Sequence, residues 1–335
     1  MSRIGGFLLA MFIAIATTAG VAFLFYKNEL GSMRDAASRG SLVANLDIGP
    51  IEYADSGAGI PLLSIHGAGG GFDQGLAIAA DLVGEGFRVI APSRFGYLRT
   101  PVPQDSSPAA QADAHAALLS KLNVPKAVVV GVSAGARSAV ELTLRHPDKV
   151  AALILIVPAL YSNTSPVLVE VSRGNKFAFW AVNAGGDFAW WAAEKIAPST
   201  LIRFVGVRPA LVAVAPQAER DRVMSFIKRV EPLSLRFPGI NIDSIPELHK
   251  LPLEEITAPT IIISARDDLF NTLPAAKFAA GKIPGAKLVV YDTGGHLLVG
   301  QVQEVRTAIR TFLASAGLIP SSDATETVTH HRARF

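Results

Sequence analysis

Short runs of apolar residues recur along the chain and are the clearest structural signal in the sequence. They lack the alternation of apolar and polar residues typical of a strand with one solvent-exposed face, so they indicate strands buried on both faces. Helical stretches such as Ser107–Leu122 and Ala134–Arg145 separate most of them. This pattern predicts a doubly wound α/β fold with a parallel sheet. The predicted strands are Pro61–Ile65, Phe87–Ala91, Lys126–Val130, Ala152–Val157, Thr260–Ile263 and Lys287–Tyr291.

Residues 159–258 interrupt this alternation of strands and helices. The interruption has helical runs but no strand pattern, and at about a hundred residues it is far longer than an ordinary crossover connection. We therefore expect a helical cap inserted into a core formed by residues 42–158 and 259–318. All three tryptophans, Trp180, Trp190 and Trp191, lie in the insertion. They form its own core or line a pocket, and the first role is the more usual one for aromatic residues.

The N-terminal segment is the longest apolar run. Ile4–Tyr26 contains no charged residue, and as a helix it is about 34 Å long, enough to cross a bilayer core of roughly 30 Å. A cleaved signal peptide has a shorter apolar stretch, and the small-residue site Thr18-Ala19-Gly20 falls inside this run. We therefore predict a transmembrane anchor over residues 1–27 rather than a signal peptide. We expect the globular part on the outer, periplasmic or extracellular, side.

Two polar segments flank the predicted core. Residues 28–41 carry glycine and serine without sustained apolar periodicity and are expected to form a linker or a surface helix. Residues 319–335 are rich in serine and threonine and end near His330-His331. We expect this tail to be disordered and its paired histidines to be solvated rather than bound to a metal.

Composition excludes several classes of protein. The 335 residues are 50% hydrophobic and 18% charged, which rules out a disordered chain and fits one large domain with an insertion. There is no cysteine, so disulfides, thiolate metal sites and a cysteine nucleophile are all excluded. The net charge is only +3, and basic residues do not cluster with aromatic ones. Nucleic acid is therefore not an expected partner.

The pentapeptide Gly131-Val132-Ser133-Ala134-Gly135 is the first candidate for chemistry. It follows a predicted strand and precedes a helical stretch, so Ser133 lies on a tight strand-to-helix turn. Such a turn projects the serine oxygen above the sheet, and the glycines relieve the clash between strand and helix. A purely structural turn is the alternative, but the placement favours a nucleophile.

A serine nucleophile needs a base that is itself oriented by a carboxylate. Of the seven histidines, we favour His296, which lies in the short glycine-rich loop Thr293–His296 between a predicted strand and a predicted helix, where parallel sheets place their chemistry. Asp267 and Asp268 follow the strand before it. We favour Asp268, because in folds of this type the acid commonly lies three residues past a small residue that closes the strand, here Ala265. Asp267 is the alternative acid, or it caps the following helix.

The glycine-rich segment His66–Phe72 follows another predicted strand. It fails as a dinucleotide-binding fingerprint, because Phe72 and Gln74 occupy the positions at which a third glycine is required. As an oxyanion loop, its Ala68 amide and the Ala134 amide would donate hydrogen bonds to the charged oxygen of a tetrahedral intermediate. We therefore expect an oxyanion hole made by these two amides, with no cofactor and no metal, and we expect His66 to hold the loop.

From Leu42 to Leu318 the chain resembles the α/β-hydrolase superfamily, in a cap-bearing branch similar to esterases and carbon–carbon bond hydrolases. The resemblance rests on the His66–Gly69 loop, the Gly131–Gly135 turn, Asp268 and His296, in the chain order nucleophile, acid, base. It implies an eight-stranded, mostly parallel sheet, a cap inserted after the sixth strand, and a substrate held between cap and core.

One departure concerns a turn that many of these relatives share, of the Asp-x-Arg-Gly type. This chain keeps Arg94 and Gly96 but has Ser93 in place of the acid. Relatives that hydrolyse haloalkanes or epoxides carry an aspartate nucleophile, so Ser133 argues against both activities.

The expected function is that of a membrane-anchored serine hydrolase. His296 would take the proton of Ser133, the serine would attack an acyl carbonyl, and Asp268 would orient His296. The expected partner is a small, apolar acyl substrate. Carbon–carbon bond hydrolysis, cofactor-free perhydrolysis on the same triad, and a catalytically idle binding protein of the same fold are the alternatives. The oligomeric state is left open.

Overall fold

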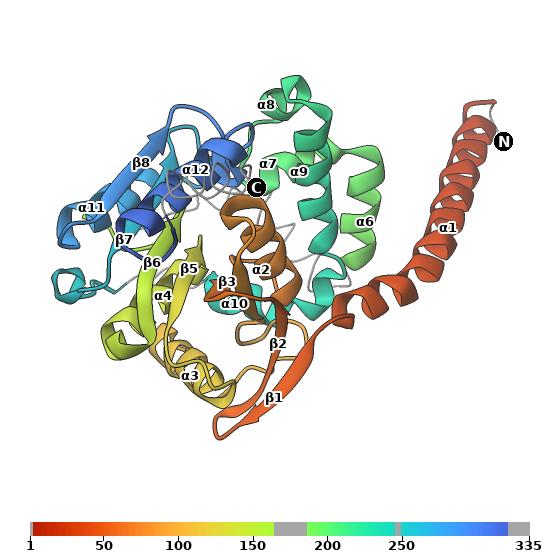
Figure 1. Ribbon diagram of the computed structural model, residues 1–335. Coiled ribbons are helices and arrows are strands. Elements are labelled where there is room, and N and C mark those ends of the chain that lie inside the picture. The colour runs from red at the N-terminus through yellow and green to blue at the C-terminus, as the bar shows by residue number, and fades with distance from the viewer. Residues whose placement is uncertain (1–2, 164–185, 245–248, 321–335) are drawn as a thin grey trace, which may run out of the picture.

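An eight-stranded sheet forms the centre of the protein in the computed structural model, which describes residues 3–163, 186–244 and 249–320 (Figure 1). The strands are β1 (Leu42–Leu46), β2 (Gly49–Gly57), β3 (Ile60–Ile65), β4 (Phe87–Pro92), β5 (Ala127–Val132), β6 (Val150–Ile156), β7 (Thr260–Ala265) and β8 (Lys287–Tyr291). Their order in the sheet is β1-β2-β4-β3-β5-β6-β7-β8. The pairs β1–β2 and β2–β4 are antiparallel, and every other pair is parallel. The expected eight-stranded, mostly parallel sheet is confirmed.

The apolar runs of the sequence correspond to β3 through β8, with ends that differ by one or two residues. The pattern does not predict the antiparallel hairpin of β1 and β2. The reason is visible in β2, which carries Glu52 and Asp55 and so does not form an apolar run. Glu52 is nevertheless fully buried.

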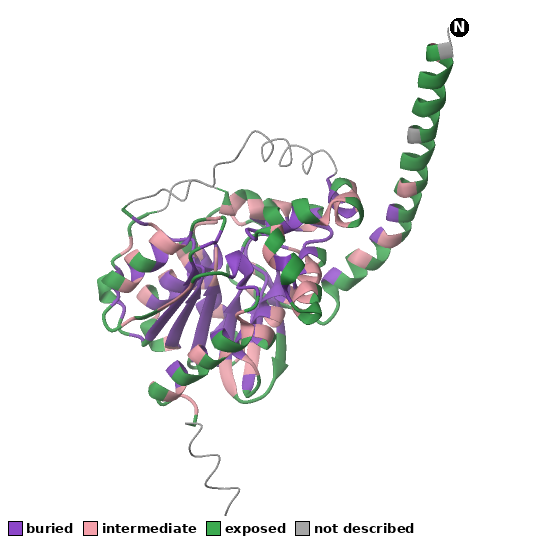
Figure 2. Ribbon diagram, turned by 90° about the horizontal axis from the view of Figure 1, so that it is seen from above, coloured by how far each residue is buried: buried purple, intermediate pink, exposed green. Residues whose placement is uncertain are grey.

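Helices cover both faces of the sheet. One layer contains α3 (Pro108–Lys121), α4 (Gly135–Arg145) and α11 (Leu273–Lys282), and the other contains α2 (Phe72–Ile78), the π-helical turn Ala79–Val83 and α12 (Val302–Ser315). Alternate residues of a strand face opposite layers: Val129 packs in the first layer, whereas Val128 and Val130 pack in the second. Both faces are therefore buried, as Figure 2 shows for the central strands, and this explains why the apolar runs do not alternate.

The long connection between β6 and β7 is helical in the part that the structure describes. It packs against the loop after β8, because Leu297 and Val299 belong to the same buried cluster as Val207 and Val223. Trp190 is buried in this cluster, as expected for an internal core, whereas Trp180 lies outside the described residues. The helices are α6 (Asp187–Ile196), α7 (Pro198–Phe204), α8 (Pro209–Val214), α9 (Gln217–Arg229) and α10 (Phe237–Asp243), with 3-10 turns at Leu233–Leu235 and Leu253–Glu255.

The N-terminal helix α1 (Arg3–Ser38) projects away from the rest of the molecule (Figures 1 and 2). Its most apolar window is not buried at all, and its length and hydropathy are those of a membrane anchor or of a signal sequence. Residues 28–38, for which the sequence allows a linker or a surface helix, continue the same helix. Nearer the body, Tyr26 packs on Trp191 of α6, and the indole N–H of Trp191 donates to Glu29 at 2.9 Å.

The C-terminal helix α12 ends at Ser315, and the described chain continues to residue 320. Most of the tail that we expect to be disordered, including His330 and His331, lies outside the described residues.

Candidate active site

Ser133 lies in the turn between β5 and α4. Its backbone has a φ of 50°, a left-handed conformation that is uncommon for a residue with a side chain. The flanking glycines allow strand and helix to approach closely: a Cβ atom on Gly131 would lie 2.6 Å from Cβ of Ala139, and one on Gly135 would lie 2.4 Å from the carbonyl oxygen of His66. The turn therefore places Ser133 at the carboxyl end of β5, in the strand–turn–helix context expected from the sequence.

Backbone hydrogen bonds tie the carboxyl ends of four neighbouring strands together. They link the chain after β5 to β6, the chain after β6 to β7, and the chain after β7 to β8. Ser133 and the loops after β7 and β8 thus share one edge of the sheet. The bonds run from Ser133 N–H to Ile156 O (3.0 Å), from Val157 N–H to Ile263 O (2.7 Å) and from Arg266 N–H to Tyr291 O (2.9 Å).

His296 and Asp268 form a buried pair at this edge. Nδ1 of His296 lies 2.9 Å from Oδ2 of Asp268. Asp268 also accepts hydrogen bonds from the hydroxyl of Thr272 and the N–H of Phe270. Burial alone raises the pKa of Asp268, but the attraction of His296 and these hydrogen bonds outweigh it and lower the pKa below its ordinary value. Asp268 therefore stays ionised and can orient the imidazole.

Asp267 has a different partner. Its Oδ1 accepts a hydrogen bond from the N–H of Gly295 at 2.7 Å, which shapes the loop that carries His296. The carbonyl of Gly206, in the helical connection, accepts hydrogen bonds from His296 N–H and Leu269 N–H at 3.1 and 3.2 Å and so holds both loops. The imidazole of His296 thus contacts Asp268, the residue favoured from the sequence, and not Asp267.

Two backbone amides near Ser133 have no acceptor among the residues that the structure describes. The N–H groups of Ala68 and Ala134 donate no hydrogen bond to any residue that the structure describes, whereas the neighbouring Gly67 and Gly69 donate to Gln74 Oε1 (3.0 Å) and Tyr97 Oη (3.3 Å). The hydroxyl of Ser133 likewise has no partner in the described chain. The loops are close, because a Cβ on Gly67 would lie 3.2 Å from Cβ of Ser133. This arrangement leaves two amides available to an oxygen bound beside the serine.

His66 supports this loop, as expected. Its Nδ1 lies 2.7 Å from the carbonyl oxygen of Gly67, and its Nε2 accepts a hydrogen bond from the N–H of Arg94 at 2.9 Å. Burial, followed by the charge of Arg94, holds the pKa of His66 well below its ordinary value. The ring is therefore neutral, with its proton on Nδ1.

Ser93 occupies the position at which many of the related enzymes have an acidic residue. In this structure a carboxylate from another strand, that of Glu52 in β2, lies beside it. The Ser93 hydroxyl accepts a hydrogen bond from the N–H of Phe72 at 3.0 Å and donates one to Glu52 Oε2 at 2.8 Å. Glu52 also pairs with Arg99, whose Nε lies 2.6 Å from Oε1. The fully buried Glu52 of β2 therefore anchors the end of the His66–Phe72 loop through Ser93.

A cavity of about 370 Å³ lies beside Ala134, between α4, the start of α3 and the two ends of the long helical connection; Arg137, Leu160 and Ile242 are among its lining residues. Within the described ranges, no three histidine, aspartate or glutamate side chains are grouped so that they could hold a metal ion.

With this geometry established, comparison with known proteins assigns the class. A family model described as the alpha/beta hydrolase fold matches residues 60–301, and the chain belongs to this family of hydrolytic enzymes.

Curated relatives include both esterases and carbon–carbon bond hydrolases. The chain is 25% identical over 275 residues to a 2-hydroxymuconate semialdehyde hydrolase of Pseudomonas putida, covering 80% of this chain and 92% of that protein. It is 29% identical over 245 residues to a pimeloyl-[acyl-carrier protein] methyl ester esterase of Aromatoleum aromaticum, covering 70% and 90%.

Among solved structures, an alpha/beta hydrolase fold protein from Nakamurella multipartita has a TM-score of 0.65 and 29% identity, covering 83% of this chain and 99% of that one. A bacterial membrane phospholipase A has a TM-score of 0.64 and 22% identity, covering 94% and 100%. The match to the phospholipase shows a shared fold. Because it covers 94% of this chain, it includes part of α1.

The sequence did not point to the polar residues behind the His66–Phe72 loop. Glu52, Tyr97 and Asp243 all contact the side chains that hold it. Each lies outside a recognisable motif, so only the folded chain brings them together.

Proposed function

We propose that this α/β hydrolase is a serine hydrolase that cleaves an ester-type acyl bond of a small, apolar substrate. Nε2 of His296 takes the proton of Ser133 as its Oγ bonds to the acyl carbon, and the carbonyl electron pair moves onto oxygen. The amides of Ala68 and Ala134 stabilise that oxyanion. Its collapse expels the alkoxide, which takes the proton from His296. Water then releases the acid from the acyl-enzyme by the same steps, with His296 again as the base.

The buried His296–Asp268 pair, on the same sheet edge as Ser133, carries this proposal. A serine turn of structural use alone has no need for an oriented imidazole and two unbonded amides beside it. The esterase among the relatives supports the same chemistry.

Replacing Ser133 with alanine tests the nucleophile. In the detergent-solubilised full chain, Ser133→Ala should lower kcat on p-nitrophenyl esters by about 10³–10⁶-fold, because only binding and oxyanion contributions remain. It should also abolish labelling by a fluorophosphonate. The matched control is Ser120→Ala on the exposed surface of α3, which should keep both properties. Near-normal ester hydrolysis by Ser133→Ala would refute the assignment, and a wild-type chain that is not labelled would indicate an idle binding protein.

Carbon–carbon bond hydrolysis on the same residues is the second candidate, favoured by the 2-hydroxymuconate semialdehyde hydrolase among the relatives. A panel that compares nitrophenyl esters of increasing chain length with a dienoic diketone separates the two. An ester hydrolase should have a higher kcat/KM on the best ester than on the diketone. A carbon–carbon bond hydrolase should have a higher kcat/KM on the diketone than on any ester.

We further propose that residues 1–27 anchor the protein in a membrane, with the catalytic domain on the outer side. The exposed apolar face of α1 supports this, because none of its most apolar window packs on the protein. The intact mass of membrane-bound protein after an alkaline wash should include residues 1–27, whereas a cleaved signal peptide would remove most of them. A membrane-impermeant fluorophosphonate should label intact cells, and labelling only after lysis would place the domain on the inner side.

A further inference from the structure

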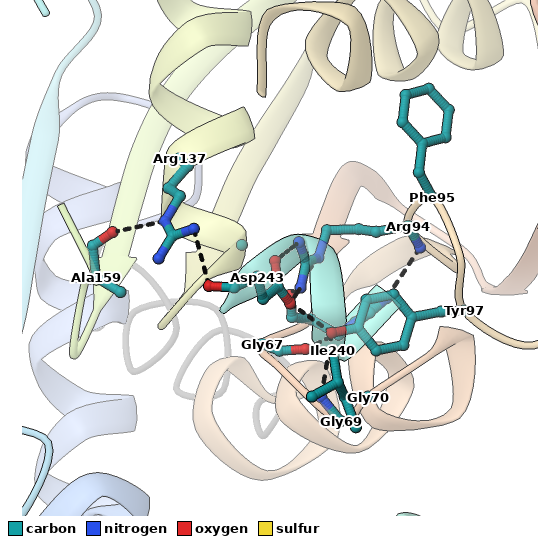
Figure 3. A network of polar contacts seen from close by, with 12 residues as sticks. Gly67, Gly69, Gly70, Arg94, Phe95, Tyr97, Arg137, Ala159, Ile240 and Asp243 are labelled. Atoms are coloured by element: carbon teal, nitrogen blue, oxygen red, sulfur yellow. Dashed lines mark hydrogen bonds and ion pairs between the residues drawn. The ribbon is translucent and has the colours of Figure 1, made fainter. Parts of the chain in front are cut away.

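Asp243 is a buried carboxylate at the end of α10, in the long helical connection, and it lies against the loops of the core (Figure 3). Its two oxygens accept hydrogen bonds from Nη1 and Nη2 of Arg94 at 2.8 and 2.5 Å. Oδ2 also accepts a hydrogen bond from the hydroxyl of Tyr97. The side chains of Arg94 and Asp243 are only 7% and 6% exposed, so solvent screens this contact little.

The network around Asp243 reaches both peptide groups that flank Ala68. On one side, Tyr97 Oη accepts the hydrogen bond of Gly69 N–H. On the other side, Arg94 donates from its backbone N–H to His66 Nε2 and from Nε to the His66 carbonyl at 3.0 Å, and Nδ1 of His66 donates to the carbonyl of Gly67. The peptide groups on both sides of Ala68 are therefore fixed, one through Tyr97 and the other through Arg94 and His66. The side chains of Tyr97 and Arg94 both contact Asp243.

Electrostatics keep this network in one protonation state. Burial raises the pKa of Asp243, but the charge and hydrogen bonds of Arg94 outweigh it and lower the pKa below its ordinary value. The backbone carbonyl of Asp243 also accepts a hydrogen bond from Nη1 of Arg137 at 3.2 Å (Figure 3), and Arg137 lies in α4, four residues after Ser133. The end of α10 is thus bonded both to the oxyanion loop and to the helix that follows the serine.

We propose that Asp243 is a positioning residue for the oxyanion site: through Tyr97 and Arg94 it fixes the direction of the Ala68 amide, so that α10 sets the reactivity of Ser133. The inference rests on the proposed function. A small change in the direction of an oxyanion donor reduces stabilisation of the transition state while substrate binding is kept, because the oxyanion forms only as the reaction proceeds.

The test uses the full chain in detergent with the variants Asp243→Asn and Tyr97→Phe. Asp243→Asn removes the charge that neutralises Arg94. Tyr97→Phe keeps that ion pair and removes only the hydroxyl between Gly69 and Asp243, so it remains informative if Asp243→Asn does not fold. Each should lower kcat per active site by about 10–100-fold, less than the loss of a whole oxyanion donor, with KM changed by less than about threefold. The active sites are counted by complete fluorophosphonate labelling.

A second measurement separates positioning from stability. A trifluoromethyl ketone forms an oxyanion when Ser133 adds to it, so its affinity should fall by about the same factor as kcat. The double variant should lose less activity than the product of the two single losses, because both changes break the same chain of contacts.

Two matched variants serve as controls. Asp187→Asn replaces another buried carboxylate of the helical connection, one whose partner is Ser234. Tyr53→Phe removes the hydroxyl of a buried tyrosine in the core cluster. Both should keep wild-type kcat per active site and wild-type ketone affinity.

The outcomes distinguish this inference from the proposed function. If Tyr97→Phe and Asp243→Asn lower the melting temperature or the number of active sites but keep kcat and ketone affinity per site, Asp243 is only structural and the inference is wrong. If Ser133→Ala retains activity in the same assay, the proposed function itself fails.

Discussion

Asp267 and Asp268 are adjacent in the sequence, yet the fold gives them different partners. The choice of Asp268 from the sequence depends on its offset from Ala265, at the end of β7, and in the structure it is Asp268 that contacts the imidazole. The contact of Asp267 with the N–H of Gly295 could not be predicted, because it depends on how the loop after β8 turns back.

This difference predicts unequal effects of the same substitution at the two positions. Asp268→Asn should lower kcat/KM by about 10³–10⁴-fold, since an amide neither fixes the productive tautomer of His296 nor stabilises its cation. Asp267→Asn keeps an oxygen that can accept the hydrogen bond of Gly295 and should lower kcat/KM by less than about tenfold. Steady-state kinetics on an ester check both, and losses of equal size would contradict the assignment.

Residues whose partners lie far away in the sequence are harder to recognise from the sequence than residues in motifs. Ser133 and His296 lie in short glycine-rich segments whose spacing is visible in the sequence. Asp243 meets Arg94 across 149 positions and Tyr97 across 146, and nothing near it in the sequence marks it. Glu52 is similar, because a buried glutamate in a polar stretch looks like a surface residue until its partners Ser93 and Arg99 are known.

At the scale of elements, burial decides what the sequence can predict. Strands β3 to β7 appear as apolar runs because helices cover both of their faces, whereas β8 keeps an apolar run although it lies half-exposed at the other edge of the sheet. The hairpin of β1 and β2 lies at the edge of the sheet, where exposed and polar residues interrupt the pattern. Packing between distant segments decides the order of the strands and the contacts of the long connection. The local pattern of apolar residues carries no information about such packing.

The junction of α4 with β3 gives a prediction about elements. A Cβ on Gly135 would lie 2.4 Å from the carbonyl oxygen of His66 and 2.8 Å from that of Ile65, and backbone atoms cannot rotate away. Gly135→Ala should therefore push α4 from the end of β3, lower the melting temperature and reduce kcat by disturbing the His66–Phe72 loop.

Gly281→Ala is the matched control for this change, since it lies in α11 with nothing within 4 Å of the added atom. It should leave activity unchanged and stabilise the helix by about 0.5–1 kcal/mol. Thermal unfolding and ester kinetics measure both variants, and a Gly135→Ala enzyme with wild-type values would show that α4 and β3 do not constrain each other.

At the scale of the whole molecule, charges of α1 and of the long helical connection act on one buried acidic residue. Glu231, just after α9, is 6% exposed, and neither of its carboxylate oxygens has a hydrogen-bond partner in the described chain. Burial, and then the charge of Glu194 on α6, raise its pKa from 4.5 to about 7. Lys195 and Lys228 oppose this shift, and Glu29 of α1 adds to it.

The raised pKa of Glu231 predicts how stability depends on pH. Between 4.5 and about 7 the folded chain keeps a proton that the unfolded chain has lost, so the free energy of unfolding decreases as the pH rises through this window. Above it the folded chain must hold a buried, unpaired carboxylate. Glu231→Gln removes that charge, so its melting temperature should match the wild type near about pH 4, below this window, and exceed it near about pH 8. The gain should reach at least about 2–4 °C, the shift that roughly 1 kcal/mol produces in a large domain.

Glu254→Gln, at an exposed position, should show no such divergence. Melting temperatures of wild type and Glu231→Gln that run parallel across the whole pH range would mean that Glu231 is solvated or paired in solution.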